Sequence, residues 1–226
     1  FGTVSYISEG GSDIFVAAFD SMGQVRYSKS IGNSINNELS SVCSDSIGNL
    51  YLSGTFSGLL EIQGQTLQSS TISNFILKLD PNGQLIWLKL LKAKGVNNIL
   101  DMKLSEDGSD IWISGDYSDS LIYDTESLFC LSLYNLFVLK LNSSDGSAEW
   151  MQDVHNSKWI KGSAVTPLPD GTAWVAAEFR DSLEILGHLY FYSITHTDIL
   201  MLRINSDGQW ISHKRWGGVY NDRPVK

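Results

Sequence analysis

A segment of about sixty residues recurs along the chain, and this repeat constrains the fold more than any other feature of the sequence. Each copy contains a short apolar run that leads into a glycine turn, and the turn is followed by a strand with an aromatic residue near its start. The runs begin at Asp13, Asn74, Asn135 and Asp198, and the aromatic residues are Tyr27, Trp87, Trp150 and Trp210. Chance does not produce the same register in every copy, so the chain is predicted to be an array of similar structural units.

The remaining part of the repeat is also recognisable. Short predicted strands at residues 39–44, 99–104 and 160–165 end in glycine turns, and the strands that follow carry an aromatic residue at one equivalent position, Tyr51, Trp112 or Trp174. The alternation of large and small residues has a period of two, which is typical of strands and not of helices. Each repeat is therefore predicted to hold four strands, joined by two tight hairpins and one long connection, which is the content of one β-propeller blade.

The predicted fold class is an all-β β-propeller of four-stranded antiparallel blades, with about three and a half blades present. Residues 1–37 are predicted to end a preceding blade, residues 38–97, 98–157 and 158–216 to form three blades, and residues 217–226 to start a further blade or form a tail. A blade buries its faces only against neighbouring blades, so an open array would leave two apolar faces in water. The natural protein is therefore expected to continue on both sides. The alternative is a complete small propeller closed by the short tail.

The charge and the apolar pattern narrow the class of partner. The chain has a formal net charge of −9 and no basic stripe, so no nucleic-acid partner is expected. No apolar run approaches the length of about eighteen residues that a membrane-spanning helix needs, so no membrane-spanning segment is expected. Cys43 and Cys130 fall at different places in the repeat. Both are expected to be free or buried and not bridged to each other.

The repeat resembles, across nearly the whole chain, the bacterial β-propeller repeat known as SBBP. The resemblance is carried by residues 74–83, Trp87, Gly217 with Gly218, residues 45–54 and residues 60–67. The third complete repeat is the most divergent, and the Gly-Gly element is reduced to a single glycine elsewhere in the chain. The similarity implies a propeller in a secreted or surface-exposed bacterial protein, often a large multidomain one. It implies no catalytic residues, because the motif of that family is structural.

Strand direction identifies one face of the predicted array as the candidate for function. The short turns share one face, the long connections share the other, and functional groups are usually carried by long loops on a rigid scaffold. On the long-loop face, Asp116 and Asp119 of one repeat recur as Glu178 and Asp181 of the next. Paired carboxylates of this kind could bind a ligand, perform acid–base chemistry on a glycosidic bond or hold a divalent cation.

Several observations favour structural roles for these residues over a ligand-binding or catalytic site. Thr55 and Gly58 interrupt the acidic pattern in the first complete repeat, so a solvated acidic rim is the favoured interpretation of the four carboxylates. Tyr51, Trp112 and Trp174 could form a ring that stacks against a ligand, but a core between blades is favoured for them. The Asp-x-x-Gly turns have too few oxygen ligands for a calcium loop, and the histidines show no zinc-ligand spacing. No metal and no cofactor is predicted.

The sequence therefore favours a non-enzymatic module of an extracellular or cell-surface protein, which binds a protein or glycan partner or serves as a structural scaffold. The reason is a repeat with a structural consensus and no asymmetric cluster of chemically active residues. The alternative is a carbohydrate-active enzyme or lectin with its site on the long-loop face. A third possibility is a subunit of a filament or larger assembly, in which blades contact neighbouring chains.

Overall fold

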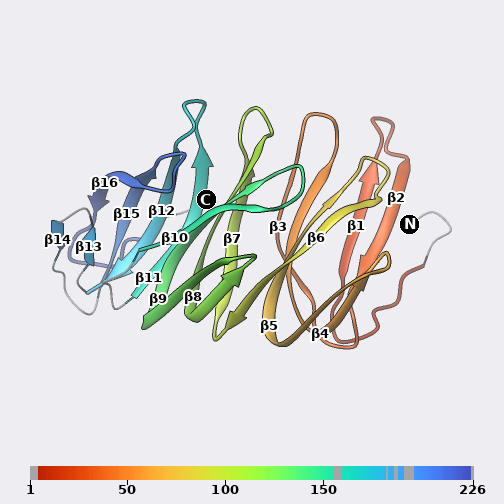
Figure 1. The fold of residues 1–226 in the computed structure, drawn as a ribbon, viewed down its shortest axis with the longest axis horizontal. Coiled ribbons are helices and arrows are strands. Elements are labelled where there is room, and N and C mark those ends of the chain that lie inside the picture. The colour runs from red at the N-terminus through yellow and green to blue at the C-terminus, as the bar shows by residue number, and fades with distance from the viewer. Residues whose placement is uncertain (1–4, 155–158, 182, 186–187, 191–195, 225–226) are drawn as a thin grey trace. The chain divides into compact units, whose positions relative to one another are not determined.

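The computed structural model describes residues 5–154, 159–181, 183–185, 188–190 and 196–224. These residues form strands β1 to β16 and no helix, so the prediction of an all-β fold is confirmed (Figure 1). The chain divides into two compact units, residues 1–92 and 93–226.

The first unit contains a hairpin and a four-stranded meander. The hairpin is an antiparallel pair, β1 (Ile14–Phe19) and β2 (Val25–Ile31). The meander pairs four strands in sequence order, each antiparallel to the next: β3 (Glu38–Ser44), β4 (Leu50–Ile62), β5 (Gln65–Leu79) and β6 (Leu85–Lys94).

The second unit contains two four-stranded antiparallel meanders. The first consists of β7 (Asn97–Leu104), β8 (Asp110–Tyr123), β9 (Glu126–Asn142) and β10 (Ala148–Asp153). The second consists of β11 (Trp159–Pro167), β12 (Ala173–Arg180), β15 (Thr197–Ile204) and β16 (Trp210–Trp216). Between β12 and β15 the chain forms a short hairpin, β13 (Leu183–Ile185) with β14 (His188–Tyr190).

The strand register shows which positions of the repeat are equivalent. On adjacent strands, Tyr51 lies opposite Lys78, Trp112 opposite Lys140, and Trp174 opposite Arg203. The predicted equivalence of the three aromatic residues is therefore confirmed. The same register makes Ser73, and not Asn74, the counterpart of Asn135 and Asp198. The sequence comparison was wrong by one residue at this point, because it matched two asparagines that lie on opposite faces of their sheets.

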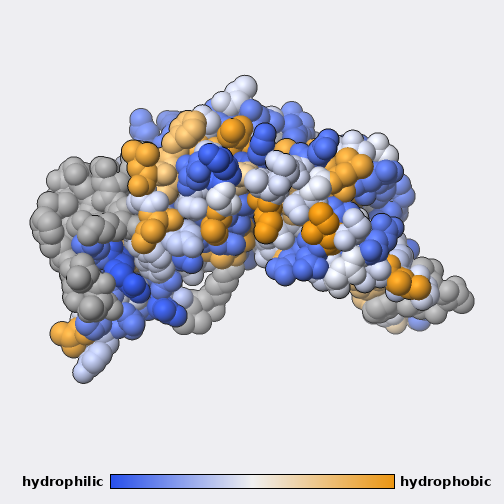
Figure 2. Space-filling model, turned by 90° about the horizontal axis from the view of Figure 1, so that it is seen from below, coloured by the Kyte–Doolittle hydropathy of each residue, from blue (hydrophilic) through white to orange (hydrophobic). Residues whose placement is uncertain are grey.

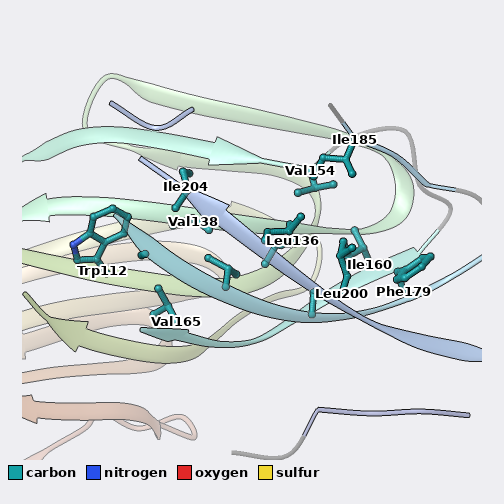
Figure 3. Close-up of a cluster of buried hydrophobic side chains, with 14 of the residues drawn as sticks. Trp112, Leu136, Val138, Val154, Ile160, Val165, Phe179, Ile185, Leu200 and Ile204 are labelled. Atoms are coloured by element: carbon teal, nitrogen blue, oxygen red, sulfur yellow. The ribbon is translucent and has the colours of Figure 1, made fainter. Parts of the chain in front are cut away.

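Each sheet has two faces formed by alternate residues. We call the face that carries Tyr51, Trp112 or Trp174 the forward face and the opposite face the backward face. In the second unit, the forward face of the β7–β10 sheet packs on the backward face of the sheet formed by β11, β12, β15 and β16 (Figure 3). The forward face contributes Trp112, Leu136, Val138, Trp150 and Val154, and the backward face contributes Ile160, Val165, Val175, Phe179, Leu200, Leu202 and Ile204.

The first unit repeats this packing with equivalent residues. Ile14 and Val16, on the forward face of the β1–β2 hairpin, occupy the register positions of Leu136 and Val138. They pack on the backward face of the β3–β6 sheet, which contributes Leu52, Phe56, Phe75, Leu77 and Leu79. Burial of one such side chain contributes roughly 1.5–3 kcal/mol. Each unit is therefore held together by the same kind of sheet-on-sheet contact.

Hydrogen bonds connect the two sheets of the second unit at several points. The indole Nε1 of Trp150 donates to the carbonyl oxygen of Ser206 at 2.7 Å, and the indole Nε1 of Trp210 donates to that of Asp153 at 3.3 Å. The Asp101 carboxylate of β7 accepts a hydrogen bond from the backbone N–H of Val165 in β11 at 3.1 Å. These contacts fix the position of one sheet against the other in addition to the apolar packing.

The long connection between the second and third strands of a repeat is itself a hairpin that folds back onto its own sheet. In the first unit, the Gln63 Nε2 at the hairpin tip donates to the Gly83 carbonyl at 2.9 Å, and its Oε1 accepts from the Leu85 N–H at 3.1 Å. The β8–β9 hairpin makes the matching contacts with Tyr123 to Gly146 and Ala148 to Asp124. In these two repeats the predicted long connection is therefore not an irregular loop but a paired continuation of β4 with β5 and of β8 with β9.

Candidate functional site

Asp116 and Glu178 are the two predicted site residues that the structure brings near each other. Asp116 lies in β8 with 1% of its surface exposed, and Asn98 Nδ2 of β7 donates to its Oδ2 at 3.1 Å. Burial raises the pKa of Asp116; the Asn98 hydrogen bond and the Lys161 ammonium oppose this rise, and the Glu178 carboxylate adds to it. The two carboxylates therefore interact electrostatically, although they belong to different meanders of the second unit.

Glu178 occupies the matching position of β12, opposite Lys161 of β11 in the register. Its side chain is 18% exposed, and its Oε2 lies 3.3 Å from the Nε of Arg223 in the segment after β16. Lys161 and Arg223 thus place two positive charges beside the carboxylates of Asp116 and Glu178. Each predicted carboxylate of this pair has a partner within its own chain.

Asp119 and Asp181 recur for a reason that lies in the backbone. Their φ angles are 61° and 71°, and Gly58 at the same position of the first complete repeat has a φ of 77°. This left-handed region is open to glycine and is tolerated by aspartate more readily than by most residues. Asp119 also lies 3.5 Å from the Lys94 ammonium, with both side chains exposed. The interruption of the acidic pattern at Gly58 is thus the expected variation at a position that needs a positive φ.

The aromatic rings near these carboxylates are in contact with the chain's own cations. The Lys161 ammonium lies 4.5 Å from the ring centroid of Tyr134 and 5.6 Å from that of Trp159. The Arg180 guanidinium lies 5.3 Å from the Trp159 centroid. Sugar-binding sites commonly use an aromatic face that is open to the ligand, whereas cation–π contacts already engage these rings. The cluster resembles a connection between sheets more than an open ligand site.

A second cation–π contact recurs in every four-stranded sheet, and the sequence interpretation missed it. Across adjacent strands, the basic group lies 5.0 Å from the ring centroid in Lys78 with Tyr51, 5.4 Å in Lys140 with Trp112, and 5.9 Å in Arg203 with Trp174. Tyr51 and Trp112 are buried and Trp174 is half-buried, so the aromatic set does not form an exposed stacking ring. The signal was present in the sequence, because a basic residue recurs in the three apolar runs that begin at Asn74, Asn135 and Asp198.

Among these cations, Lys140 is buried between two carboxylates. Its ammonium lies 3.0 Å from an Asp110 oxygen and 2.8 Å from a Glu149 oxygen, with 8% of its side chain exposed. Burial alone would lower the pKa of Lys140, but the hydrogen bonds and charges of Glu149 and Asp110 outweigh burial and raise it. The ammonium is therefore held in its charged form between two carboxylates and an indole ring.

The Asp-x-x-Gly segments are hairpin turns, as predicted. In the turn after β5, the Asp80 Oδ1 accepts hydrogen bonds from the backbone N–H groups of Asn82 at 2.8 Å and Gln84 at 2.7 Å, and Gly83 has a φ of 77°. The carboxylate thus serves the turn itself. Within the described ranges, no group of three or more histidine, cysteine, aspartate or glutamate residues is arranged to hold a metal ion.

The first unit contains a small crevice of about 280 Å³ between β2 and the β4–β5 hairpin. It is lined by Tyr6, Ser28, Lys29, Ser30, Ile31, Glu61, Ile62, Gln63 and Leu79. The Tyr6 hydroxyl donates to the Ser28 carbonyl at 2.6 Å, and Gln63 is engaged with the turn at Gly83. Much of the polar lining is therefore already committed to contacts within the chain.

An exposed apolar stripe on β9 is a second feature that the sequence interpretation missed. Phe129, Leu131 and Leu133 alternate along the strand and are 68%, 102% and 69% exposed. The register places the polar Gln68 at the position of Phe129 in the first unit. The stripe of the β8–β9 hairpin is therefore not repeated in the β4–β5 hairpin.

No family model matches the chain, and no curated protein is significantly similar to it. The resemblance to the SBBP repeat accordingly stays a prediction. In the portion of the chain that the structure describes, none of the segments is a helix long and apolar enough to cross a membrane.

Proposed function

We propose that this chain is a run of β-propeller blades that serves as a non-enzymatic binding or scaffold module of an extracellular or cell-surface protein. The observation that carries this proposal is the repeated sheet-on-sheet contact, in which equivalent residues pack forward face on backward face in both units. Four-stranded antiparallel meanders that stack in this way are the building units of a propeller. A scaffold of this kind presents its surface without needing a catalytic centre.

The state of the predicted carboxylates supports a non-enzymatic role. Asp116 is buried and bonded to Asn98, and Glu178 is paired with Arg223. Asp119 and Asp181 occupy positions with a positive φ that glycine also fills. A glycosidase needs one carboxyl group that reaches the leaving oxygen and a second that reaches the sugar or a water molecule. In this arrangement each carboxylate has a structural explanation.

A protein partner fits the described surface better than a glycan. Phe129, Leu131 and Leu133 expose apolar side chains on one strand, and contact with such a stripe is typical of protein partners. On the face that Figure 2 draws, hydrophobic side chains are separated from one another by polar ones. The stripe thus offers a partner three large apolar side chains on one strand.

The second candidate function is a carbohydrate-active enzyme or a lectin. It is favoured by one observation, the electrostatic coupling of Asp116 with Glu178 and the raised pKa of Asp116, which is a feature of acids in glycosidase sites. In this hypothesis the ligand would displace Lys161 or Arg223 from the carboxylates.

The two functions are separated by a glycan array and a panel of chromogenic glycosides, assayed with the wild type, Asp116→Asn and Glu178→Gln. Asp119→Asn serves as the control, because it changes an exposed carboxylate at a backbone-determined position. We expect neither turnover nor glycan binding from any of the four proteins. Turnover or binding that is lost in Asp116→Asn and retained in Asp119→Asn would establish the carbohydrate function instead.

A further inference from the structure

The crevice of the first unit combines an apolar lining with one positive and one negative charge. Its buried apolar residues are Ile31 of β2, Ile62 of β4 and Leu79 of β5, which also belong to the core of this unit. The basic residue of the lining is Lys29 and the acidic one is Glu61. Ligand sites are typically concave and largely apolar, with a few polar groups that orient the ligand. The crevice therefore has the composition of a small binding site.

Lys29 stands where a charged group is costly unless it has a partner. Its register opposite Val16 places it on the forward face of the β1–β2 hairpin, which packs on the β3–β6 sheet, and it is half-buried. Its Cε lies beside the β5–β6 turn, 2.8 Å from where a Cβ added to Gly83 would be. Lys140 in the second unit is paired with two carboxylates, whereas the described residues give Lys29 no ion pair. The Lys29 ammonium is thus positioned without a counter-charge.

Glu61 stands on the other wall of the crevice, on the β4–β5 hairpin opposite Thr66. Its neighbour Gln63 fixes this wall, because the Gln63 Nε2 donates to the Gly83 carbonyl oxygen at 2.9 Å. The stem of Lys29 packs beside the same glycine. The two walls are therefore held at one turn. Among the described residues, Glu61 has no ion pair with Lys29 or with another cation, so the two charges do not neutralise each other.

We propose that this crevice binds a small zwitterion, with an anionic group at Lys29, a cationic group at Glu61 and a short apolar body against the buried part of the lining. A free α-amino acid with an aliphatic side chain has these three parts. A simple anion would face the Glu61 carboxylate and a simple cation would face the Lys29 ammonium, so charge complementarity favours a ligand that carries both charges. The volume of about 280 Å³ lies just below the range of about 300–1,000 Å³ that is typical of sites for drug-sized ligands, which limits the ligand to a small molecule.

The test is an NMR titration of the isotope-labelled chain at pH 7 with leucine, leucinamide and isocaproate. Leucinamide lacks the carboxylate of leucine, and isocaproate lacks its ammonium group. Leucine should bind about tenfold more tightly than leucinamide, which loses a charge-assisted hydrogen bond to the half-buried Lys29. It should bind about threefold more tightly than isocaproate, because the ion pair with the exposed Glu61 is weaker. The amide signals that shift should be those of residues 28–31 and 61–63.

Two variants assign each charge of the crevice to one end of the ligand. Lys29→Met should weaken the binding of leucine about tenfold and leave the binding of leucinamide unchanged. Glu61→Gln should weaken the binding of leucine about threefold and leave that of isocaproate unchanged. Lys92→Met and Glu38→Gln are the matched controls, because they remove the same charges from exposed positions outside the crevice. Both controls should bind all three probes as the wild type does.

Three outcomes would overturn the proposal. The first is that millimolar leucine shifts no signal of the crevice, and the second is that leucine and its two analogues bind equally well. The third is that Lys92→Met weakens leucine binding as much as Lys29→Met does, since net charge alone would then explain the effect. The comparison of leucine with its analogues uses the wild type, so it decides the question even if a variant does not fold.

Discussion

Strands β9 and β15 occupy the same place in two successive sheets, yet their burial differs. In β9, residues 135–141 are all buried, whereas in β15 buried residues alternate with half-buried ones. The two strands have similar sequences, with apolar runs interrupted by a basic residue at the same register position, Lys140 or Arg203. The difference between them therefore comes from what packs on the forward face and not from the strands themselves.

This comparison shows that burial in a repeat protein is a property of position in the array. The forward face of β9 is covered by the next sheet, and the forward face of β15 keeps its half-exposed side chains. The stability of such an array is approximately the sum of the stability of each repeat and of the contacts between neighbours. Equivalent substitutions in the two sheets should consequently have unequal costs, and the difference measures the contact between sheets.

The largest expected difference is between Trp112→Ala and Trp174→Ala. Trp112 is 1% exposed and packs in the core between two sheets, so its loss should lower the free energy of unfolding by about 3–5 kcal/mol. Trp174 is half-buried at the equivalent position, and its loss should cost no more than about half as much, because less packing is removed. Urea denaturation of both variants measures the two costs. Equal losses in the two variants would show that the contact between sheets does not cause the difference in burial cost.

The fold could be predicted from the sequence because its signals are local and repeated. The period-two alternation, the glycine turns and the aromatic positions at Tyr51, Trp112 and Trp174 all follow from strand geometry and turn chemistry. The one-residue error at Asn74 arose because residue identity was matched where only the pairing of Lys78 with Tyr51 defines the register. The contacts that hold the tip of the β4–β5 hairpin could not be predicted, because they join Gln63 to a turn 20 residues away.

The candidate site was harder to predict, because carboxylates can recur for reasons other than chemistry. Asp119 recurs through a backbone conformation that the sequence reveals only indirectly, by the glycine at position 58. The burial of Asp116 depends on the packing of two sheets. Sequence spacing did identify Asp116 and Glu178 as matching positions of successive repeats. The structure places them close enough to interact. Their partners Asn98, Lys161 and Arg223 lie on other strands or segments and were not predicted.

A polar contact at one position of the two sheets provides the next comparison. In the first sheet of the second unit, Asn135 Nδ2 donates to Asp153 at 3.0 Å, and in the last sheet Arg215 donates to Asp198 at 2.9 Å from Nε. The register makes Asn135 equivalent to Asp198 and Asp153 equivalent to Arg215. The carboxylate of the pair thus lies on β10 in one sheet and on β15 in the other.

The second prediction is that Arg215→Met lowers the free energy of unfolding by about 2–3 kcal/mol, since it removes charge-assisted hydrogen bonds from a carboxylate that is 3% exposed. The double variant Asp198→Asn with Arg215→Asp recreates the pair of the other sheet and should regain most of this loss. Recovery should be incomplete, because Phe179 stands where Tyr117 donates a further hydrogen bond to Asp153. A double variant no more stable than Arg215→Met would refute the equivalence of the two pairs.

The smallest effect is expected at Asp116, and its sign is opposite to the others. Because the pKa of Asp116 is raised in the folded protein, the folded state binds its proton more tightly than the unfolded chain, in which the pKa is about 3.9. Stability from this group is present below that value and is lost as the pH rises through the folded pKa. Asp116→Asn avoids the loss and can still accept the Asn98 hydrogen bond, so it should raise the free energy of unfolding at pH 7 by roughly 1 kcal/mol, with a smaller gain or none near pH 4.

Glu178→Gln is the matched control, which should bring no gain because it gives up the ion pair with Arg223. Thermal unfolding across this pH range decides the question: a gain that is equal at both pH values would show that burial of the Asp116 charge is not its cause.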